Sequence, residues 1–225
     1  MESIYIGKTK DVFKLKDGNY LLKFKDDVTS ANGVFDPGAN STGLKIEGAG
    51  QAGLAMSAYF FKLLAANNIP THFVDYNLSE NTMVVKPVKV FGKGLEVICR
   101  LKATGSFTKR FGEYINDGAP LDYYVEVTTK NDLAGDPFIN EEALTQLNIL
   151  NNADYQKIIN LTKDITRLIK AELAKKAIEL YDIKYEFGFD QTGILLIDEI
   201  SGGNMRTYKN NKKLMPLELS ALVLK

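Results

Sequence analysis

Carboxylate and lysine side chains near the end of the chain could bind a nucleotide and its metal ion. Lys184 and Glu186 are two residues apart, so they share a face if their segment is a strand. Asp198 joins that face only if the loop before its strand has five residues, or three with a glycine bulge. A loop of two residues would put Asp198 on the other face. Two carboxylates without a nearby His or Cys suit Mg²⁺, but a surface Lys–Glu pair beside a strand-end Asp explains the spacing equally well.

A basic segment in the middle of the chain could bind a phosphate monoester or a carboxylate. A strand that ends in Arg100 is followed by the small residues 103–106 and then by Lys109 and Arg110. Ser106 adds a hydroxyl, and the turn offers backbone N–H groups beside the positive charges. A solvated basic loop is the alternative, and it explains the charges but not the small residues.

Two further polar segments are less specific. Lys8 and Lys10 follow Gly7 and point the same way in an extended chain, which suits a polyphosphate, although an exposed turn is the simpler interpretation of this segment alone. Lys130 and Asp136 lie in a polar, turn-forming stretch that by itself predicts only a loop.

The elements that must position these residues follow from hydrophobic periodicity and turn signals. Strands come in antiparallel runs with helices between groups of strands, so the pattern predicts an α+β fold. Residues 28–50 are rich in Gly, Ser, Asn and Thr and predict a long loop. The predicted helices are 51–66 and 153–180, and the predicted strands are 12–15, 20–24, 72–74, 83–86, 95–100, 123–127, 183–189 and 194–198.

Pro87, Gly92 and Gly94 cluster after Lys86 and predict a hinge. The chain is 225 residues long, which allows one large or two small domains. We therefore divide it into an N-terminal β-rich domain, 1–86, and a C-terminal α+β domain, 87–225.

The composition excludes several classes of protein. The 28 Lys and Arg residues balance the 28 Asp and Glu residues, so no overall basic field exists to hold nucleic acid or an anionic membrane. Cys99 and His72 are the only residues of their types, which argues against an internal disulfide and the usual zinc sites. The start of the chain lacks the apolar stretch of a signal peptide. We expect a cytoplasmic protein whose chemistry depends on carboxylates, lysines, arginines and a metal ion.

Residues 48–53 match the glycine spacing of a dinucleotide-binding turn, GxGxxG, and Asp75 follows at a suitable distance. The segment before the glycines, 44–47, is short and charged, whereas a parallel strand covered on both faces should be apolar. The context therefore disfavours a nicotinamide-dinucleotide site.

Taken together and in order, six segments resemble the SAICAR synthetase family, the phosphoribosylaminoimidazole-succinocarboxamide synthases of purine biosynthesis. These segments are GKTKDVF (7–13), LLKFKDDVTS (21–30), EVICRLKATGS (96–106), TKNDLAGDP (129–137), LYDIKYEFG (180–188) and LLIDEIS (195–201).

The resemblance implies a kinase-small-lobe-like N-terminal lobe and an ATP-grasp-like C-terminal lobe in a homodimeric ligase that uses ATP and Mg²⁺. It implies that ATP phosphorylates the carboxylate of carboxyaminoimidazole ribonucleotide, and that the amine of L-aspartate then displaces phosphate. Such a reaction needs no nucleophile from the enzyme, in agreement with the absence of a convincing His- or Cys-based set.

The resemblance also implies a role for each candidate residue. Lys130 and Lys184 would be catalytic; Lys8, Lys10, Lys86, Glu186 and Asp198 would bind ATP; Arg100, Ser106, Asp136 and Arg206 would bind the substrates; and Glu186, Asp198 and Asp182 would hold the metal.

The sequence departs from the family pattern at several points. Gly202-Gly203 stands where the family usually has Pro-Asp, and Ala49 stands where it has a lysine. The chain ends at Lys225, before the usual closing helix. Two alternatives therefore stay open: a paralogue that joins a different carboxylate and amine, and a non-catalytic protein that binds ATP as a regulator.

Overall fold

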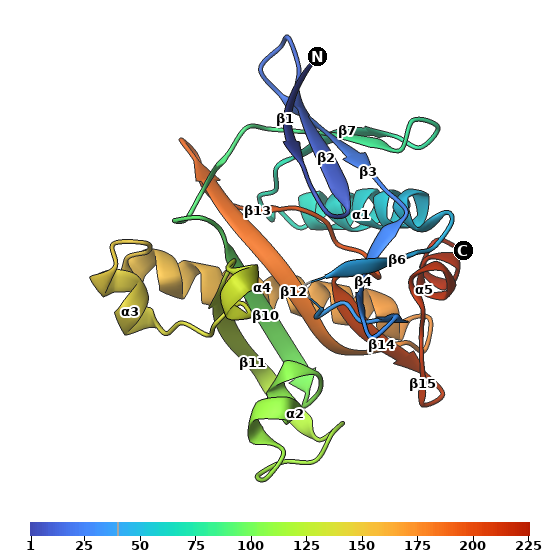
Figure 1. Cartoon of the computed structure of the whole chain (residues 1–225), viewed down its shortest axis with the longest axis vertical. Helices are drawn as coiled ribbons and strands as arrows, with labels where there is room; N and C mark the ends of the chain where they lie inside the picture. The colour runs from blue at the N-terminus through green and yellow to red at the C-terminus, as the bar shows by residue number, and fades with distance from the viewer. Residues whose placement is uncertain (40) are drawn as a thin grey trace. The chain divides into compact units, whose positions relative to one another are not determined.

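The computed structural model describes residues 1–39 and 41–225 of the chain and confirms the α+β class (Figure 1). The chain forms two compact units. Unit 1 contains Met1–Lys89, Glu199–Asn204 and Leu214–Lys225, and unit 2 contains Val90–Asp198 and Met205–Lys213. In the described part of the chain, no helix combines the length and apolar character needed to cross a membrane.

Unit 1 is built around an antiparallel five-stranded sheet in the order β1-β2-β3-β8-β7. A hairpin that turns at Asp17-Gly18 joins β2 to β3 and places Lys10 opposite Phe24. The strands are β1 (Glu2–Ile6), β2 (Lys10–Lys14), β3 (Tyr20–Phe24), β7 (Phe73–Asn77) and β8 (Thr82–Val85).

The prediction of a long loop over residues 28–50 was wrong. This segment contains a three-stranded sheet in the order β5-β4-β6, whose Val28 and Phe35 are buried. Its strands are β4 (Asp27–Ala31), β5 (Val34–Phe35) and β6 (Thr42–Lys45). Glycine and small polar residues hid the strands because they carry no apolar alternation.

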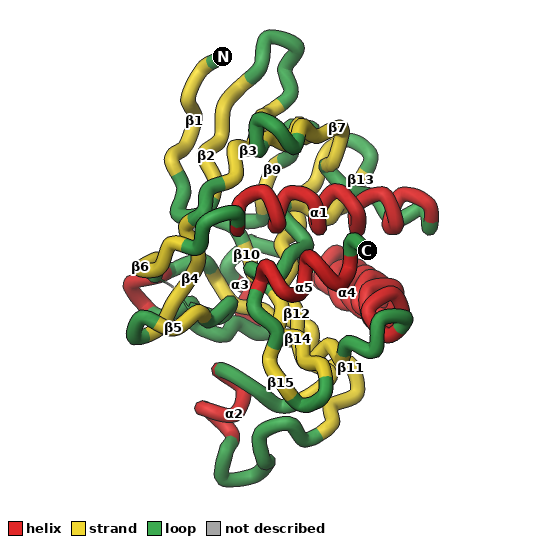
Figure 2. The backbone as a smooth tube through the Cα atoms, turned by 90° about the vertical axis from the view of Figure 1, so that its right-hand side faces the viewer, coloured by secondary structure: helices red, strands yellow, loops and turns green. Residues whose placement is uncertain are grey.

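Two helices complete unit 1. The predicted helix, α1 (Ala49–Ala66), packs against α5 (Pro216–Val223), which the sequence analysis did not find (Figure 2). Gly50, in the first turn of α1, allows a close approach of the backbone, because a Cβ there would lie 2.8 Å from the Lys25 carbonyl oxygen. The preceding strand, β6, belongs to an antiparallel sheet, so the surroundings of the glycines are not those of a dinucleotide-binding turn.

Unit 2 contains a larger antiparallel sheet in which β10 lies between β11 and β12 (Figure 1). Glu96 is opposite Glu186 and Arg100 is opposite Asp182 across β10 and β12. The strands are β9 (Lys89–Val90, where the chain enters the unit), β10 (Leu95–Lys102), β11 (Pro120–Thr129), β12 (Glu179–Asp190), β13 (Gly193–Ile197), β14 (Met205–Lys209) and β15 (Lys212–Lys213).

The long helix α4 (Asn152–Ala174) covers one face of this sheet and contacts β10, β11, β12 and β13. Asn151 caps its first turn by accepting a hydrogen bond from the Asp154 N–H. The helix ends six residues before the predicted 180, because Ala177 adopts a left-handed backbone (φ 54°) and β12 begins at Glu179. The shorter helices of unit 2 are α2 (Ser106–Phe111), η1 (Asp132–Ala134) and α3 (Glu141–Gln146).

The buried face of the sheet is apolar apart from a few hydroxyl and thiol groups. Ile165 and Ile169 of α4 are fully buried, as is Cys99 of β10. The Thr166 and Tyr185 hydroxyls lie 3.0 Å apart in this core. Because side chains alternate along a strand, residues 96, 98 and 100 of β10 lie on the face opposite Cys99.

Candidate active site

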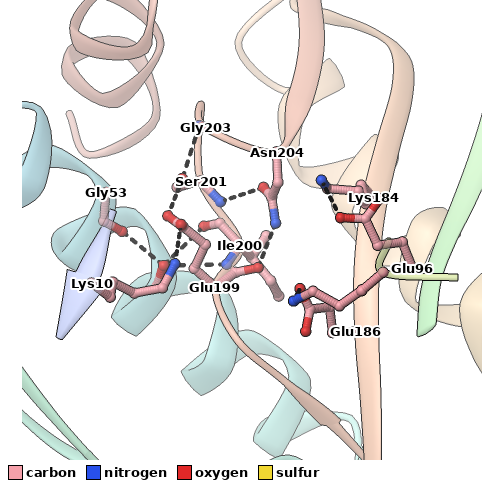
Figure 3. Close-up of polar contacts among 12 residues, drawn as sticks. Lys10, Gly53, Glu96, Lys184, Glu186, Glu199, Ile200, Ser201, Gly203 and Asn204 are labelled. Carbon is pink, nitrogen blue, oxygen red and sulfur yellow. Dashed lines mark hydrogen bonds and ion pairs between the residues drawn. The ribbon is translucent and has the colours of Figure 1, made fainter. Parts of the chain in front are cut away.

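One group of charged side chains, the carboxylate–lysine cluster, is built around the polar face of the unit 2 sheet. Figure 3 labels three of its members, Glu96, Lys184 and Glu186. The Lys130 Nζ lies 2.6 Å from the Glu186 Oε1, and the Lys184 Nζ lies 2.7 Å from the Glu96 Oε1. β10 and β12 bring Glu96 beside Glu186 because the two residues are paired across the strands. The cluster consists of Glu96, Lys130, Lys184, Glu186 and Asp198.

The hairpin before Asp198 has the two-residue loop, since Asp190 pairs with Gly193. Glu186 is therefore opposite Ile197, and not opposite Asp198. Asp198 lies just beyond the end of β13 with a left-handed backbone (φ 67°), so simple alternation no longer determines its direction. It is nevertheless close enough to act electrostatically on both Glu186 and Lys130.

The cluster carries an excess of negative charge. Burial, followed by the nearby Asp198 carboxylate, raises the pKa of Glu186 above its ordinary value, although Lys130 opposes the change. Burial disfavours the charged form of Lys130, but attraction to Glu186 and Asp198 outweighs it and raises the pKa of Lys130. Three carboxylates against two ammonium groups leave a formal charge of −1. Oxygen ligands with surplus negative charge fit a divalent cation such as Mg²⁺.

Asp136 lies near the same cluster. It adopts a left-handed backbone (φ 49°) and accepts a hydrogen bond from the Asn131 N–H at 2.7 Å. Burial raises the pKa of Asp136; the Asn131 N–H opposes the increase, whereas the Glu96 charge adds to it. The structure thus brings Asp136 and the cluster together.

A second group, the arginine cluster, lies four residues away along the same two strands. Its centre is the buried Arg100, which donates to Glu126 through Nε (2.9 Å) and to Asp182 through Nη1 (2.7 Å). Other N–H groups of Arg100 reach the Thr104 carbonyl oxygen (3.2 Å), the Ser106 Oγ (2.8 Å) and again Glu126 (2.5 Å). All five N–H groups of Arg100 are therefore bonded within the protein.

Two more arginines complete the arginine cluster. The Arg206 Nη1 donates to Asp182 at 2.7 Å, and Arg110 forms an ion pair with Glu126. Gly105 is required beside Arg206, because a Cβ there would lie 2.7 Å from the guanidinium and the backbone has φ 58°. The cluster consists of Arg100, Ser106, Arg110, Glu126, Asp182 and Arg206, and its three guanidinium groups exceed its two carboxylates by one charge.

The structure does not bring Asp182 together with the other predicted metal ligands. Asp182 precedes Glu186 by four residues on β12, a distance of about 13 Å. Its carboxylate instead joins Arg100 to Arg206. Within the described residues, no group of three or more His, Cys, Asp or Glu side chains is arranged to hold a metal ion.

In unit 1, the predicted phosphate-binding Lys10 pairs with Glu199, a residue that the sequence analysis did not select (Figure 3). Lys8 is exposed between β1 and β2. Lys86 is also exposed, and its backbone N–H donates to the His72 carbonyl oxygen at 2.7 Å.

The sequence analysis also missed Glu96, Arg110 and Glu126. Glu96 and Glu126 are acidic residues flanked by apolar residues in their strands, which is a usable signal because an unpaired charge there is costly. Arg110 was noted only as part of the basic segment. The partners of these residues come from distant parts of the chain, so spacing alone could not identify them.

Comparisons with known proteins identify the family of the chain. The family model described as SAICAR synthetase matches residues 3–217. A phosphoribosylaminoimidazole-succinocarboxamide synthase of Clostridium tetani is 57% identical over the full length of both chains. The enzyme of that name from Streptococcus pneumoniae is 37% identical over 91% of this chain and 83% of its own. A solved structure named SAICAR synthetase (Type-2) in complex with ADP has a TM-score of 0.83 and 32% identity, covering 93% of this chain and 86% of that one. The chain belongs to the SAICAR synthetase family.

Proposed function

We propose that the chain is an ATP-dependent ligase that joins carboxyaminoimidazole ribonucleotide to L-aspartate. A carboxylate oxygen of the ribonucleotide attacks the γ-phosphorus of ATP, the bond to the ADP oxygen breaks, and an acyl phosphate forms. The amine of aspartate then attacks the acyl carbon, phosphate leaves with the electrons of the C–O bond, and the nitrogen loses a proton. The product is an amide, and the step belongs to purine biosynthesis.

The observation that carries this proposal is the placement of two oppositely charged clusters on one sheet. The carboxylate–lysine cluster suits a metal-bound nucleotide, and the arginine cluster suits an anionic acceptor. Phosphoryl transfer depends mainly on positioning and charge stabilisation, which fixed ion-pair networks provide. The family membership of the chain supports the same reaction.

We assign Mg²⁺ to Glu186 and Asp198 of unit 2. On the family resemblance, we also assign Lys8 and Lys10 of unit 1 to the ATP phosphates. The metal would neutralise phosphate charge when it is bound. We do not assign Asp182 to the metal, because it is bonded to two arginines. Lys86 remains assigned to ATP on the family resemblance alone.

At the transfer end, Lys130 and Lys184 are proposed to stabilise charge on the moving phosphoryl group. Both ammonium groups are held by carboxylates of the same cluster, which fixes their positions before the nucleotide binds. Asp136 is proposed to orient the aspartate amine or the acceptor from the adjacent loop.

At the acceptor end, Arg206 and Ser106 are proposed to hold the phosphate of the ribonucleotide. Arg100 was predicted as a direct ligand, but all its N–H groups have partners within the protein. We therefore assign Arg100 the role of holding Ser106 and Asp182 in place.

The experiment that tests the function is a coupled assay of ADP release with the purified chain, ATP, Mg²⁺, carboxyaminoimidazole ribonucleotide and L-aspartate. We expect release that requires every component, with the succinocarboxamide product identified by mass spectrometry. ADP release only with another carboxylate and amine would identify a paralogue, and ATP binding without any turnover would identify a regulator.

We also propose a cytoplasmic homodimer. Analytical ultracentrifugation of the active enzyme would measure its molar mass and show whether it is a dimer. Growth without purines of cells that lack their own enzyme, once they express this chain, would test the pathway in the cell.

A further inference from the structure

We propose that Glu199 is the positioning residue for Lys10, a role that rests on the proposed contact between Lys10 and the nucleotide phosphates. Both residues belong to unit 1: Lys10 begins β2, and Glu199 begins the segment Glu199–Asn204.

The ion pair between Lys10 and Glu199 is largely shielded from water. The Lys10 side chain is 11% exposed and that of Glu199 is 12% exposed. The Lys10 ammonium also lies 5.3 Å from the centre of the Phe24 ring, its cross-strand neighbour. Electrostatic attraction is stronger at such a position than at an open surface. The pair can therefore hold the ammonium in one place.

Glu199 is itself held by the segment that follows it (Figure 3). The Ser201 hydroxyl donates to the Glu199 Oε2 at 2.5 Å, and the Gly203 N–H donates to the Ser201 Oγ at 2.9 Å. The Asn204 side chain closes the loop by donating to the Glu199 carbonyl oxygen (2.6 Å) and accepting from the Ser201 N–H (2.9 Å). This set of bonds fixes the carboxylate independently of Lys10.

Glycines make room for this arrangement. A Cβ on Gly53 of α1 would lie 3.3 Å from the Glu199 Oε2, and one on Gly203 would lie 3.2 Å from the Ser201 Oγ. A Cβ on Gly202 would lie only 2.7 Å from the Pro216 Cα at the start of α5. The Gly202-Gly203 departure from the family pattern thus has a packing role beside Glu199.

A fixed partner matters because a lysine side chain is flexible. A free ammonium on a four-carbon stem loses rotamer entropy when it binds a phosphate. If Glu199 restricts Lys10 beforehand, less entropy is lost on nucleotide binding. Glu199 could instead compete with phosphate for the ammonium, and that alternative predicts tighter nucleotide binding when the charge is removed.

The test is a double-mutant cycle on ADP binding, measured by calorimetry in buffer with Mg²⁺. Glu199→Gln and Lys10→Met should each weaken ADP binding by about tenfold, the size of one charge-assisted hydrogen bond. The double variant should bind ADP no more weakly than Lys10→Met alone, because Glu199 would act only through Lys10. In turnover, Glu199→Gln should raise the KM for ATP and lower kcat while leaving the KM for the ribonucleotide unchanged.

Several results would overturn the inference. Unchanged or tighter ADP binding by Glu199→Gln would refute it. The inference would also be refuted if the loss of ADP affinity in the double variant equals the product of the losses in the two single variants. If Lys10→Met itself binds ADP normally, the proposed phosphate contact of Lys10 fails as well, which separates the two failures. Unfolding temperatures would show whether each variant is folded.

Two more variants serve as a substitute for Glu199→Gln and as a control. If Glu199→Gln does not fold, Ser201→Ala removes one bond to the carboxylate and should give a smaller loss of ADP affinity. A normal ADP affinity for a folded Ser201→Ala would then count against the inference. Asp164→Asn breaks an ion pair in which both side chains are more than half exposed, and it serves as the matched control with no expected effect on ADP.

Discussion

The carboxylate–lysine cluster and the arginine cluster lie on the same two strands but differ in charge and burial. In the arginine cluster, the Arg100, Glu126 and Asp182 side chains are 1–3% exposed. In the carboxylate–lysine cluster, the Lys130 side chain is 41% exposed and that of Glu186 is 17% exposed. The arginine cluster is thus mainly a fixed part of the fold. The carboxylate–lysine cluster is more accessible, and its ionisable side chains have a formal charge of −1.

The strand register explains how one sheet holds both clusters. The Glu96–Glu186 and Arg100–Asp182 pairs are four residues apart on each strand, so both pairs lie on one face. Like charges meet in the first pair and opposite charges in the second. Glu96 and Glu186 each pair with a lysine of the carboxylate–lysine cluster. Asp182 pairs with both Arg100 and Arg206.

The largest expected effect comes from breaking the buried network with Asp182→Ala. This change leaves the Arg100 and Arg206 guanidinium groups without their shared carboxylate, and the free energy of unfolding should fall by about 3–5 kcal/mol. Urea unfolding followed by circular dichroism would measure it. Asp182→Asn retains a hydrogen-bond acceptor, so its free energy of unfolding should fall by less than that of Asp182→Ala. A change below about 1 kcal/mol for Asp182→Ala would contradict the structural role of this network.

A large effect on activity, with little effect on stability, is expected from Glu186→Gln. The substitution keeps the shape of the side chain but removes the negative charge of a proposed metal ligand, so kcat should fall by about 10²–10³-fold. Asp198→Asn should act in the same way. ADP release and urea unfolding, measured on the same preparations, would separate the two quantities. Unchanged kcat in both folded variants would eliminate the metal assignment.

A smaller effect should follow Arg206→Lys in the arginine cluster. Lysine keeps the charge but loses the forked donor geometry that matches a phosphate. We expect the KM for the ribonucleotide to rise about tenfold, equivalent to about 1.4 kcal/mol, with the KM for ATP unchanged. Steady-state kinetics with each substrate varied in turn would test this. A change in the KM for ATP alone would contradict the assignment of the arginine cluster to the ribonucleotide.

The smallest effect concerns the apolar face of the sheet, where Cys99 is buried. Burial raises the pKa of this thiol from 9.0 to about 11, although a hydrogen bond from Thr166 opposes the change. Because the folded pKa is the higher one, the unfolded state loses its proton first, and stability falls as the pH rises from 9 towards 11. At pH 10 the loss from this group is about 1 kcal/mol.

The control for this pH effect is Cys99→Ala. The difference in unfolding free energy between pH 8 and pH 10 should be smaller in the variant than in the original chain by about the same 1 kcal/mol. Activity at neutral pH should be retained by the folded variant, since this face carries none of the proposed site. An equal pH difference in both proteins would show that the thiol does not contribute.

Elements with strong periodicity could be predicted from the sequence. The apolar spacing located α1 and the start of α4, and β-branched and aromatic content located β10, β11 and β12. The prediction continued α4 to residue 180 because Ala177 and Leu180 extend the apolar spacing. The left-handed turn at Ala177 carries no glycine signal, so only the tertiary structure reveals it. Strands β4–β6 were missed because β5 has only two residues and because β4 and β6 contain mostly small or polar residues.

Site residues that belong to a local sequence motif could be predicted. Site residues whose role depends on a partner far away in the sequence could not. Lys184, Glu186 and Arg100 followed from charged residues at set positions in predicted strands. Glu96 was not identified because its partner, Lys184, is 88 residues away along the chain. Glu199 was not identified because its partner, Lys10, is 189 residues away. The direction of Asp198 could not be deduced either, because its left-handed backbone interrupts the strand alternation.

The twelve-residue strand β12 has a consequence for the size of molecule that the protein can accept. A ligand that touches both clusters must span about 13 Å, the length of four strand residues. Inserting one residue between Asp182 and Glu186 would turn one cluster to the opposite face. Inserting two would keep the face and add about 7 Å. If one ligand contacts both clusters, as proposed, a change in its length can be matched on this face only by steps of two residues in the strand.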